Sequence, residues 1–531
     1  MNAHETANIV VAALEQAADT VTVDATVREI GHVLNTGDGI ARIAGLPGTK
    51  YQELLRFADG ILGVAFNLDD REIGCVLLGD DAGVTAGDPV ARTGNVVRTP
   101  VGKDLLGRIV DPLGTPLDGG PQIVPERFEP IEREAPPILA RAPVAEPLAT
   151  GIKSIDSMIP IGRGQRELII GDRSTGKTTV ALNAILNQAG TGVICVYVAI
   201  CQRASTIARV VKTLREHGAM EYTVVVVADA DSPPGLRFIA PYAGCTISEY
   251  FTETGQDTLI VYDDLTKHAQ TYREISLLLR RPPGREAYPG DIFYLHSRLL
   301  ERAAHWDDEH GGGSQTALPI IETQAQNISA YVPTNLISIT DGQIYMNPDL
   351  FQGGFLPAVD IGLSVSRVGG KTQIPAMKKI AQTARLTYTQ FIELEQFAKF
   401  GTTMEAHTKA MLDKGRRLRE LLKQSAFDPV PLAEQVLLLH LADNDALMQV
   451  DVAQVRDLER RFRQALRERH EDVLAKIAEG DKPSDEEIAA VLTTATALAE
   501  TGDTPQAQPA EAAAAAEPSP PAGDEEHAGT A

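Results

Sequence analysis

The sequence predicts a multidomain chain that runs from a small β-barrel through an α/β domain with a mainly parallel sheet to an α-helical bundle. Three changes in the hydrophobic pattern support this order. Between residues 25 and 95, apolar residues form short alternating runs between turn signals. From residue 151 to 375, buried β runs alternate with helical stretches. After Pro375 the apolar residues recur at helical spacing, which predicts a bundle over residues 379–500.

Composition and charge narrow the class of protein. The 531 residues are enough for several domains, and the apolar content of 43% is enough for their cores. The sequence has no run of about eighteen apolar residues and no secretory pattern at its N-terminus, so we expect neither a membrane span nor export. The four cysteines lack metal-binding spacing and predict reduced, packed thiols of a cytosolic protein. The net charge of −23 argues against a nucleic-acid partner.

The N-terminal part of the chain predicts a short helix and then the barrel. Within residues 1–24, residues 5–19 predict an amphipathic helix, which is either a frayed terminus or an interaction helix that needs a partner. In residues 25–95, runs such as Ile40–Ile43 and Val64–Leu68 alternate with turn signals. This spacing fits a small barrel or a sandwich, and we predict the barrel.

The middle of the chain, residues 96–378, carries an irregular Pro-rich lead and then the α/β pattern. Helical stretches separate the buried runs, which is typical of a parallel sheet covered by helices. Ligands of such sheets bind at the carboxyl ends of the strands. Four runs are predicted to be strands: Val193–Ala199, Thr223–Ala228, Thr258–Tyr262 and Leu336–Ile339.

The C-terminal part predicts helices and then a tail. Phe391, Leu394 and Phe397 recur at helical spacing, as expected of the bundle. Residues 501–531 are rich in Ala, Pro, Gly and acidic residues and hold no Lys or Arg, so we expect a disordered acidic tail. A role as an acidic lure for a partner is the less favoured interpretation of this tail.

A phosphate-binding loop is the clearest chemical motif. Its eight residues read G-x-x-x-x-G-K-T, between the apolar run Glu167–Ile170 and the helical stretch Thr179–Leu186. In this context backbone N–H groups and a helix N-terminus bind phosphates; the alternative is a chance glycine-rich turn. Lys177 can reach the β- and γ-phosphates, and Thr178 can offer its hydroxyl to Mg²⁺. The nucleotide-binding candidates here are Gly171, Asp172, Arg173, Ser174, Thr175, Gly176, Lys177, Thr178 and Thr179.

A carboxylate for the metal ion follows the apolar run Leu259–Tyr262. A buried strand of this kind delivers Asp263 to the carboxyl end of the sheet, where it can hold Mg²⁺ opposite Thr178. We choose Asp263 because it comes first off the strand. Asp264 can instead cap the next helix, Leu265–Gln270.

Longer motifs give the chain a family resemblance. The stretch Pro357–Arg367 resembles the signature shared by the alpha and beta subunits of rotary ATPases. Four further stretches extend the resemblance: Asp156–Glu167, Leu279–Asp291, Phe293–Arg302 and Ser338–Gln343. Together they resemble the alpha subunits of F-type ATP synthases, most strongly in residues 151–375.

The resemblance implies a barrel crown, a P-loop (RecA-like) nucleotide-binding domain and a helical C-terminal domain. In this family three alpha subunits alternate with three catalytic beta subunits around a central gamma-type stalk. The N-terminus contacts a peripheral, delta-type stalk subunit, and a membrane rotor couples ATP synthesis or hydrolysis to proton or sodium transport. The implied cofactors are ATP or ADP and Mg²⁺. The implied location is the cytoplasmic side of a bacterial plasma membrane.

One position predicts an alpha rather than a beta subunit. In beta subunits of the family a catalytic Glu follows the strand after the P-loop helix, and the matching residue here is Gln202. An amide does not accept a proton at neutral pH, so it cannot act as the base that activates water. The chain is therefore expected to bind Mg-nucleotide, with Gln202 beside it, and to turn it over poorly or not at all. Alternatively, Gln202 is only a polar residue of a loop, and in that case it supplies no catalytic base either.

Arg367 and Ser364 are the catalytic candidates that the resemblance implies. The family's arginine at the position of Arg367 reaches into the neighbouring beta site as an arginine finger, a task that suits a bidentate, permanently charged group. A structural salt bridge is the alternative. Ser364 lies at a position that the family needs for activity and is expected to position Arg367; Ser338 is a weaker candidate at the same interface. Gln424 matches a glutamine that the family has on the purine side of the nucleotide pocket.

Four residues depart from the alpha pattern. Ser174 stands where Gln is usual, Cys201 where Gly is usual, Leu356 where Arg is usual, and Ala426 where a second Gln is common. They cluster around the chain's own nucleotide pocket and suggest a divergent branch, such as the alternative, sodium-type bacterial ATPase. A different class stays open, namely a self-sufficient hexameric NTPase motor of the RNA-translocating or export type. Gln202 and the acidic charge count against it.

Overall fold

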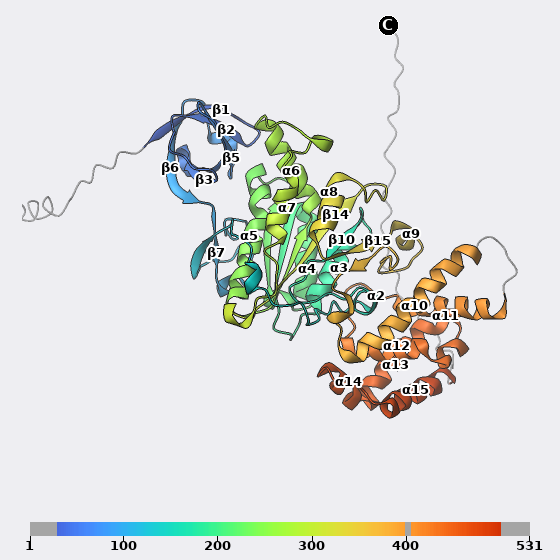
Figure 1. Ribbon diagram of the computed structural model, residues 1–531. Coiled ribbons are helices and arrows are strands. Elements are labelled where there is room, and N and C mark those ends of the chain that lie inside the picture. The colour runs from blue at the N-terminus through green and yellow to red at the C-terminus, as the bar shows by residue number, and fades with distance from the viewer. Residues whose placement is uncertain (1–28, 399–404, 501–531) are drawn as a thin grey trace, which may run out of the picture.

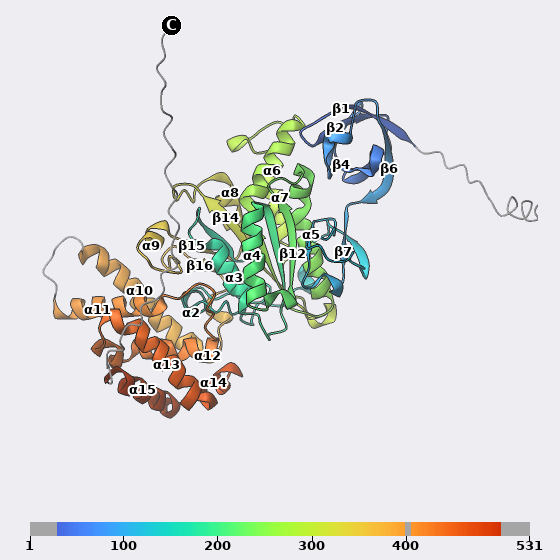
Figure 2. The same cartoon turned by 180° about the vertical axis from the view of Figure 1, so that it is seen from behind.

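The computed structural model describes residues 29–398 and 405–500. Figure 1 shows a barrel at one end, a sheet covered by helices in the middle and a group of helices at the other end, and Figure 2 shows the same arrangement from behind. The predicted fold class is confirmed. The helix predicted within residues 1–24 and the tail predicted over residues 501–531 lie outside the described residues.

Six antiparallel strands form the N-terminal barrel, which closes in the order β1-β2-β5-β4-β3-β6. Its interior is filled by small and branched apolar side chains, among them the fully buried Ala41, Ile43 and Leu55. Closure leaves no free strand edge, and it excludes the sandwich alternative. The strands are β1 (Ile30–Gly37), β2 (Ile40–Ala44), β3 (Glu53–Arg56), β4 (Leu62–Leu68), β5 (Ile73–Leu77) and β6 (Pro89–Val96).

The central sheet has eight strands in the order β16-β15-β10-β14-β13-β11-β12-β8. Every neighbouring pair is parallel except β15 and β16. Three of the four predicted strands are confirmed as β11, β12 and β13. The strands are β8 (Ile109–Val110), β10 (Leu168–Asp172), β11 (Ile194–Gln202), β12 (Thr223–Asp229), β13 (Thr258–Asp263), β14 (Gln315–Thr323), β15 (Gly342–Met346) and β16 (Val365–Ser366).

The strand predicted at Leu336–Ile339 is wrong, because these residues end helix α8 (Tyr331–Ile339). Val332, Leu336 and Ile339 are buried at intervals of four and three residues, which is helical spacing. A four-residue apolar run does not distinguish a strand from the buried side of a helix. The strand of this region is β15, which begins at Gly342, after the end of α8.

Different helices cover the two faces of the sheet. On one face lie α3 (Lys177–Leu186) and α4 (Ala204–Glu216), which share a hydrophobic core with inward residues of β11. On the other face lie α5 (Pro234–Glu253), α6 (Leu265–Leu278) and α7 (Ile292–Leu300). All four cysteines are free thiols and three are buried, as predicted. The carboxyl ends of the strands are left open for a ligand.

The Pro-rich lead is more ordered than predicted. It contributes β8, which pairs with β12 at the edge of the central sheet, and the antiparallel pair β7 (Arg98–Val101) and β9 (Arg127–Pro130). Two residues of β8 pair with β12, a length too short to leave a periodic signal in the sequence.

The C-terminal helices pack against the central domain through α2 (Lys153–Met158). Lys153 forms a buried ion pair of 2.5 Å with Glu459, which links the two regions. The helices are α10 (Pro375–Ala398), α11 (Ala406–Leu422), α12 (Leu432–Asp443), α13 (Val455–Arg469), α14 (Glu471–Ala478) and α15 (Asp485–Glu500). In the part of the protein that the structure describes, no helix is both long and apolar enough to cross a membrane.

Candidate nucleotide-binding site

The predicted phosphate loop joins the end of β10 to the start of α3. Gly176 has a φ of +94°, a left-handed conformation that favours glycine, and it caps the N-terminus of α3. Gly171 lies against β15, where an added Cβ would come within 2.5 Å of the Met346 carbonyl oxygen. Glycine is therefore required at both ends of the loop. The loop lies at the carboxyl edge of the sheet, next to the N-terminus of a helix.

Lys177 is buried and lies across the loop. Its Nζ donates hydrogen bonds to the carbonyl oxygens of Gly171 at 2.9 Å and Asp172 at 2.6 Å. Burial lowers the pKa of Lys177, and carboxylates nearby, Glu322 first among them, oppose this change. The ammonium group is thus held beside the loop by weak acceptors, which phosphate oxygens can replace with stronger, charge-assisted bonds.

Asp263 is the centre of a hydrogen-bonded cluster at the end of β13. Its Oδ2 accepts hydrogen bonds from the Thr178 hydroxyl and the Tyr197 hydroxyl, each at 2.7 Å, and its Oδ1 accepts one from Gln202 Nε2 at 2.9 Å. Asp263 is 3% exposed. The two predicted metal ligands, Thr178 and Asp263, are therefore in direct contact. A hydroxyl and a carboxylate are hard oxygen donors and fit Mg²⁺, which takes few protein ligands when phosphates complete its shell.

Asp264 caps a helix, which is the alternative role predicted for it from the sequence. Its side chain accepts a hydrogen bond from the backbone N–H of Lys267 at 2.7 Å and caps α6. Burial raises the pKa of Asp264 to about 7, and the neighbouring charge of Asp263 adds to this effect. Asp263, the last residue of β13, thus contacts Thr178 of the phosphate loop, whereas Asp264, the next residue, caps α6.

Gln202 uses its amide as a donor to Asp263. We expect Gln202→Glu to place two carboxylates in hydrogen-bond contact, so that one of them keeps a proton and its pKa rises. The variant's unfolding temperature should therefore fall, relative to the original chain, as pH rises from about 5 to about 8. Thermal scans of the variant and the original chain across this pH range check the expectation, and a difference in unfolding temperature that does not change with pH would contradict it.

A mainly apolar cavity of about 230 Å³ adjoins the phosphate loop and suits a purine base. It combines loop and helix residues with segments far along the chain. Its lining residues are Ile152, Thr175, Gly176, Thr179, Val180, Asn183, Met346, Phe351, Leu356, Pro357, Ala358, Gln424, Ser425 and Ala426. Six residues singled out in the sequence are among them: Thr175, Gly176, Thr179, Leu356, Gln424 and Ala426. Ile152 and Phe351 were missed because no local motif marks them.

Gln424 lines this cavity and also holds its walls together. Its Oε1 accepts a hydrogen bond from the Lys153 N–H at 3.1 Å, and its Nε2 donates to the carbonyl oxygens of Gly151 and Asp428, each at 2.7 Å. The amide is thus fully engaged with backbone groups.

We expect Gln424→Ala to lower the unfolding free energy by about 2–4 kcal/mol, since buried backbone groups lose their partners. Denaturant titration without nucleotide measures this loss. Gln396→Ala, at an exposed position of α10, is the matched control and should change little. A Gln424→Ala variant of unchanged stability but weaker ATP binding would instead assign Gln424 to the purine alone.

Arg367 lies next to Asp341, just before β15 and at the other end of this strand from the P-loop, whereas Ser364 lies alongside β15 near Tyr345. The exposed guanidinium of Arg367 donates to the carbonyl oxygens of Thr340 and Ile337, each at 3.0 Å. Ser364 Oγ is buried; it donates to the Asp360 carbonyl oxygen and accepts from the Tyr345 N–H. Ser364 thus fastens its loop to β15, and any influence on Arg367 passes through the backbone. Ser338 is exposed on α8.

One of the four departures from the family pattern, at Cys201, coincides with an unusual backbone conformation. Cys201 has a φ of +53°, a conformation that glycine adopts without strain and other residues rarely do. This agrees with the glycine usual at the position. The Cys201 thiol accepts a hydrogen bond from Arg237 Nη1 at 3.4 Å, and its carbonyl oxygen accepts one from Lys267 Nζ at 3.3 Å.

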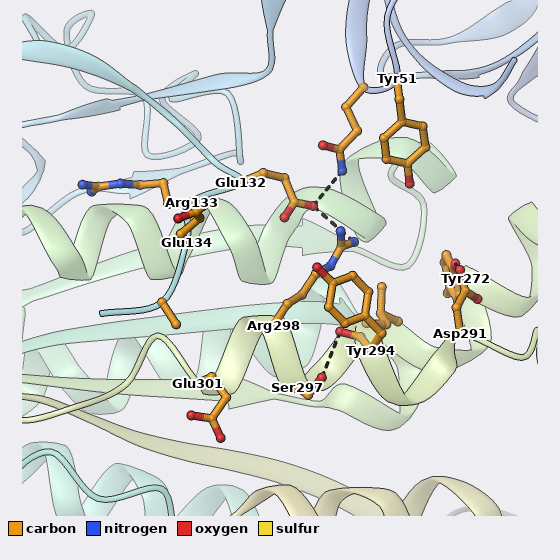
Figure 3. A pocket seen from close by; sticks show the side chains of 13 residues that line it. Tyr51, Glu132, Arg133, Glu134, Tyr272, Asp291, Tyr294, Ser297, Arg298 and Glu301 are labelled. Atoms are coloured by element: carbon orange, nitrogen blue, oxygen red, sulfur yellow. Dashed lines mark hydrogen bonds and ion pairs between the residues drawn. The ribbon is translucent and has the colours of Figure 1, made fainter. Parts of the chain in front are cut away.

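A second, more polar cavity of about 660 Å³ lies between the barrel, the segment after β9 and α7 (Figure 3). Glu132 is its central carboxylate and is already paired, with Gln52 at 3.1 Å and with Arg298 at 3.2 Å. None of its lining residues belongs to the phosphate loop. The smaller cavity, which Thr175 and Gly176 of the phosphate loop help to line, is therefore the candidate nucleotide site.

A barrel, a parallel sheet with a P-loop at its carboxyl edge and a helical domain define a P-loop ATPase-type subunit. Three family models match the sequence in the same order. They are the beta-barrel domain of the ATP synthase alpha/beta family at residues 26–94, the nucleotide-binding domain of that family at residues 151–366, and the C-terminal domain of the ATP synthase alpha/beta chains at residues 373–498.

Curated relatives agree with these models. The chain is 54% identical over 474 residues to ATP synthase subunit alpha 1 of Rhodopirellula baltica, covering 89% of this chain and 94% of the relative. It is 55% identical over 482 residues to ATP synthase subunit alpha 2 of Syntrophotalea carbinolica (91% and 92%), and 58% identical over 431 residues to ATP synthase subunit alpha of Dehalococcoides mccartyi (81% and 86%). The chain therefore belongs to the ATP synthase alpha/beta family, among the alpha subunits of F-type ATP synthases. The predicted resemblance is confirmed.

Proposed function

We propose that this alpha subunit is regulatory and non-catalytic: it holds Mg-nucleotide at its own P-loop and supplies Arg367 to a neighbouring catalytic beta site. Gln202 carries the first part of the proposal. At the position where hydrolysis needs a base, the structure has an amide whose N–H group is bonded to Asp263 at 2.9 Å. An amide in this position cannot take the proton of an attacking water.

The P-loop would bind the phosphates of ATP or ADP through its backbone N–H groups and Lys177. Thr178 and Asp263 would hold Mg²⁺, which neutralises phosphate charge when it is bound. The apolar cavity next to the loop would take the base. Among the described residues, no group of three or more His, Cys, Asp or Glu side chains forms a metal site of its own, which is in keeping with an ion that arrives with its nucleotide.

Arg367 would act outside its own subunit. Its guanidinium is exposed and bonded to two neutral carbonyl oxygens, so its positive charge is not cancelled by these contacts. A γ-phosphate presented by an adjacent beta subunit offers a stronger, bidentate partner. Ser364 would support this role by fixing the loop that carries Arg367.

We propose an alternating ring of three alpha and three beta subunits, a gamma-type central stalk, and a delta-type peripheral stalk that contacts the N-terminus. The ring would sit on the cytoplasmic side of a bacterial plasma membrane and couple ATP synthesis or hydrolysis to proton or sodium transport through the membrane rotor. The names of the relatives do not favour the alternative of a self-sufficient hexameric motor.

Reconstitution tests this proposal. The purified protein would be combined with a catalytic beta subunit and a gamma-type subunit, and ATP hydrolysis and mass would be measured for the mixture and for each component. We expect hydrolysis and a hexameric ring from the mixture only. A homohexamer of this protein that hydrolyses ATP, with or without RNA, would contradict the proposal and favour the motor.

A further inference from the structure

Tyr197 lies directly beneath the carboxylate of the proposed metal site. It is 1% exposed, in the middle of β11, and its hydroxyl donates to Asp263 Oδ2 at 2.7 Å. The same oxygen accepts the hydroxyl of Thr178, also at 2.7 Å. Three donors, Tyr197, Thr178 and Gln202, therefore hold the two oxygens of one carboxylate.

The position of Tyr197 is fixed by the sheet. β11 pairs in parallel with β12 on one side and with β13 on the other, and Tyr197 is level with Val261, two residues before Asp263. Since alternate residues of a strand face the same side, Val261 and Asp263 lie on the side that Tyr197 occupies.

The hydrogen-bond directions matter for a cation. The Thr178 hydroxyl has a single proton, which it gives to Asp263, so that its oxygen lone pairs stay free for a metal ion. This arrangement depends on the orientation of the Asp263 carboxylate. Of the three donors, Tyr197 comes from the interior of the sheet, whereas Thr178 and Gln202 come from the ends of a helix and a strand. Tyr197 is therefore the most rigid of the three.

We infer that Tyr197 is a positioning residue for the divalent cation that accompanies the nucleotide. The inference rests on the proposed function, in which Thr178 and Asp263 hold Mg²⁺. Groups that orient a metal ligand without touching the metal typically contribute roughly 10–100-fold to metal affinity. Tyr197 therefore tunes the dependence of nucleotide binding on Mg²⁺ and leaves nucleotide binding itself unchanged.

The test compares the original protein with Tyr197→Phe, which removes one oxygen and keeps the ring in the core. ATP is titrated into the purified full-length protein by calorimetry, once with excess Mg²⁺ and once with a chelator, and the ratio of the two dissociation constants is the readout. We expect Tyr197→Phe to reduce the Mg²⁺ enhancement by about 10-fold or more, with ATP affinity in the chelator unchanged. Binding in the chelator also shows that the variant is folded.

Tyr262→Phe is the matched control. Tyr262 is equally buried, on the adjacent β13, but it faces the other side of the sheet, where it is level with Val198. This control should keep the Mg²⁺ enhancement of the original protein. In an Asp263→Asn background, Tyr197→Phe should have no further effect, because it acts through Asp263.

The possible outcomes distinguish a failure of the positioning role of Tyr197 from a failure of the proposed metal site. An unchanged enhancement in Tyr197→Phe, or an equal loss in Tyr262→Phe, overturns the positioning role. A loss in Tyr197→Phe that persists in the Asp263→Asn background also overturns it. An original protein whose ATP binding does not depend on Mg²⁺ overturns the proposed metal site itself.

Discussion

Arg367→Ala is expected to lower ATP hydrolysis by the assembled alpha–beta ring about 10³–10⁵-fold, the range that arginine fingers supply. The structure gives the physical reason. Among the described residues, no carboxylate forms an ion pair with Arg367, and its bonds are to the carbonyl oxygens of Thr340 and Ile337. These bonds hold the guanidinium at the end of α8 without neutralising it, so it can stabilise charge that develops on a phosphate.

The measurement is steady-state hydrolysis by rings that differ only in the alpha subunit. The control is Lys371→Ala, which removes a positive charge four residues after Arg367. A ring with this variant should keep most of its hydrolysis rate. The isolated Arg367→Ala variant should bind ATP like the original, since the substitution leaves its own pocket intact, and it should lose some stability with the two hydrogen bonds to the end of α8. A ring that keeps its rate within about tenfold, far below the finger's range, would assign Arg367 a structural role only.

Lys177→Ala is expected to weaken ATP binding to the isolated protein roughly 10²–10⁴-fold. Hydrogen bonds to charged groups contribute about 1.5–3 kcal/mol each, and Lys177 is placed to bond to two phosphates. Its amine already lies at the loop, 2.9 Å and 2.6 Å from two backbone carbonyl oxygens that phosphates would replace. The affinity for adenosine, which has no phosphate, should not change.

Calorimetric titration measures both ligands. Lys212→Ala, an exposed lysine of α4 whose partner is Glu216, controls for the loss of one positive charge. Should Lys177→Ala reduce the affinities for ATP and adenosine equally, the loss would reflect damage to the fold, and the phosphate role would be refuted.

Local patterns predicted most of the fold and half of the site. The glycine-bounded loop between a strand and a helix located Lys177 and Thr178, because the motif includes its own structural context. Asp263 and Asp264 were separated by their order off the strand, and the structure places Asp264 at the N-cap of α6. Turn signals between alternating runs indicated the barrel.

Features that depend on pairing between distant segments were not predicted. Tyr197 reaches Asp263 only because β11 and β13 pair in a particular register, which no pattern within β11 reveals. The base cavity also includes Ile152 and Phe351, from two separate parts of the sequence that no local motif marks. The strand prediction at Leu336–Ile339 failed because a short apolar run fits both periodicities.

The most direct test of the account uses the purified protein alone. Equilibrium titration with Mg-ATP and a phosphate-release assay on the same sample separate binding from turnover. We expect saturable binding with no phosphate release above the uncatalysed rate, because Gln202 supplies no base. Sustained hydrolysis by the protein alone would contradict the non-catalytic role, and the absence of any binding would contradict the nucleotide site.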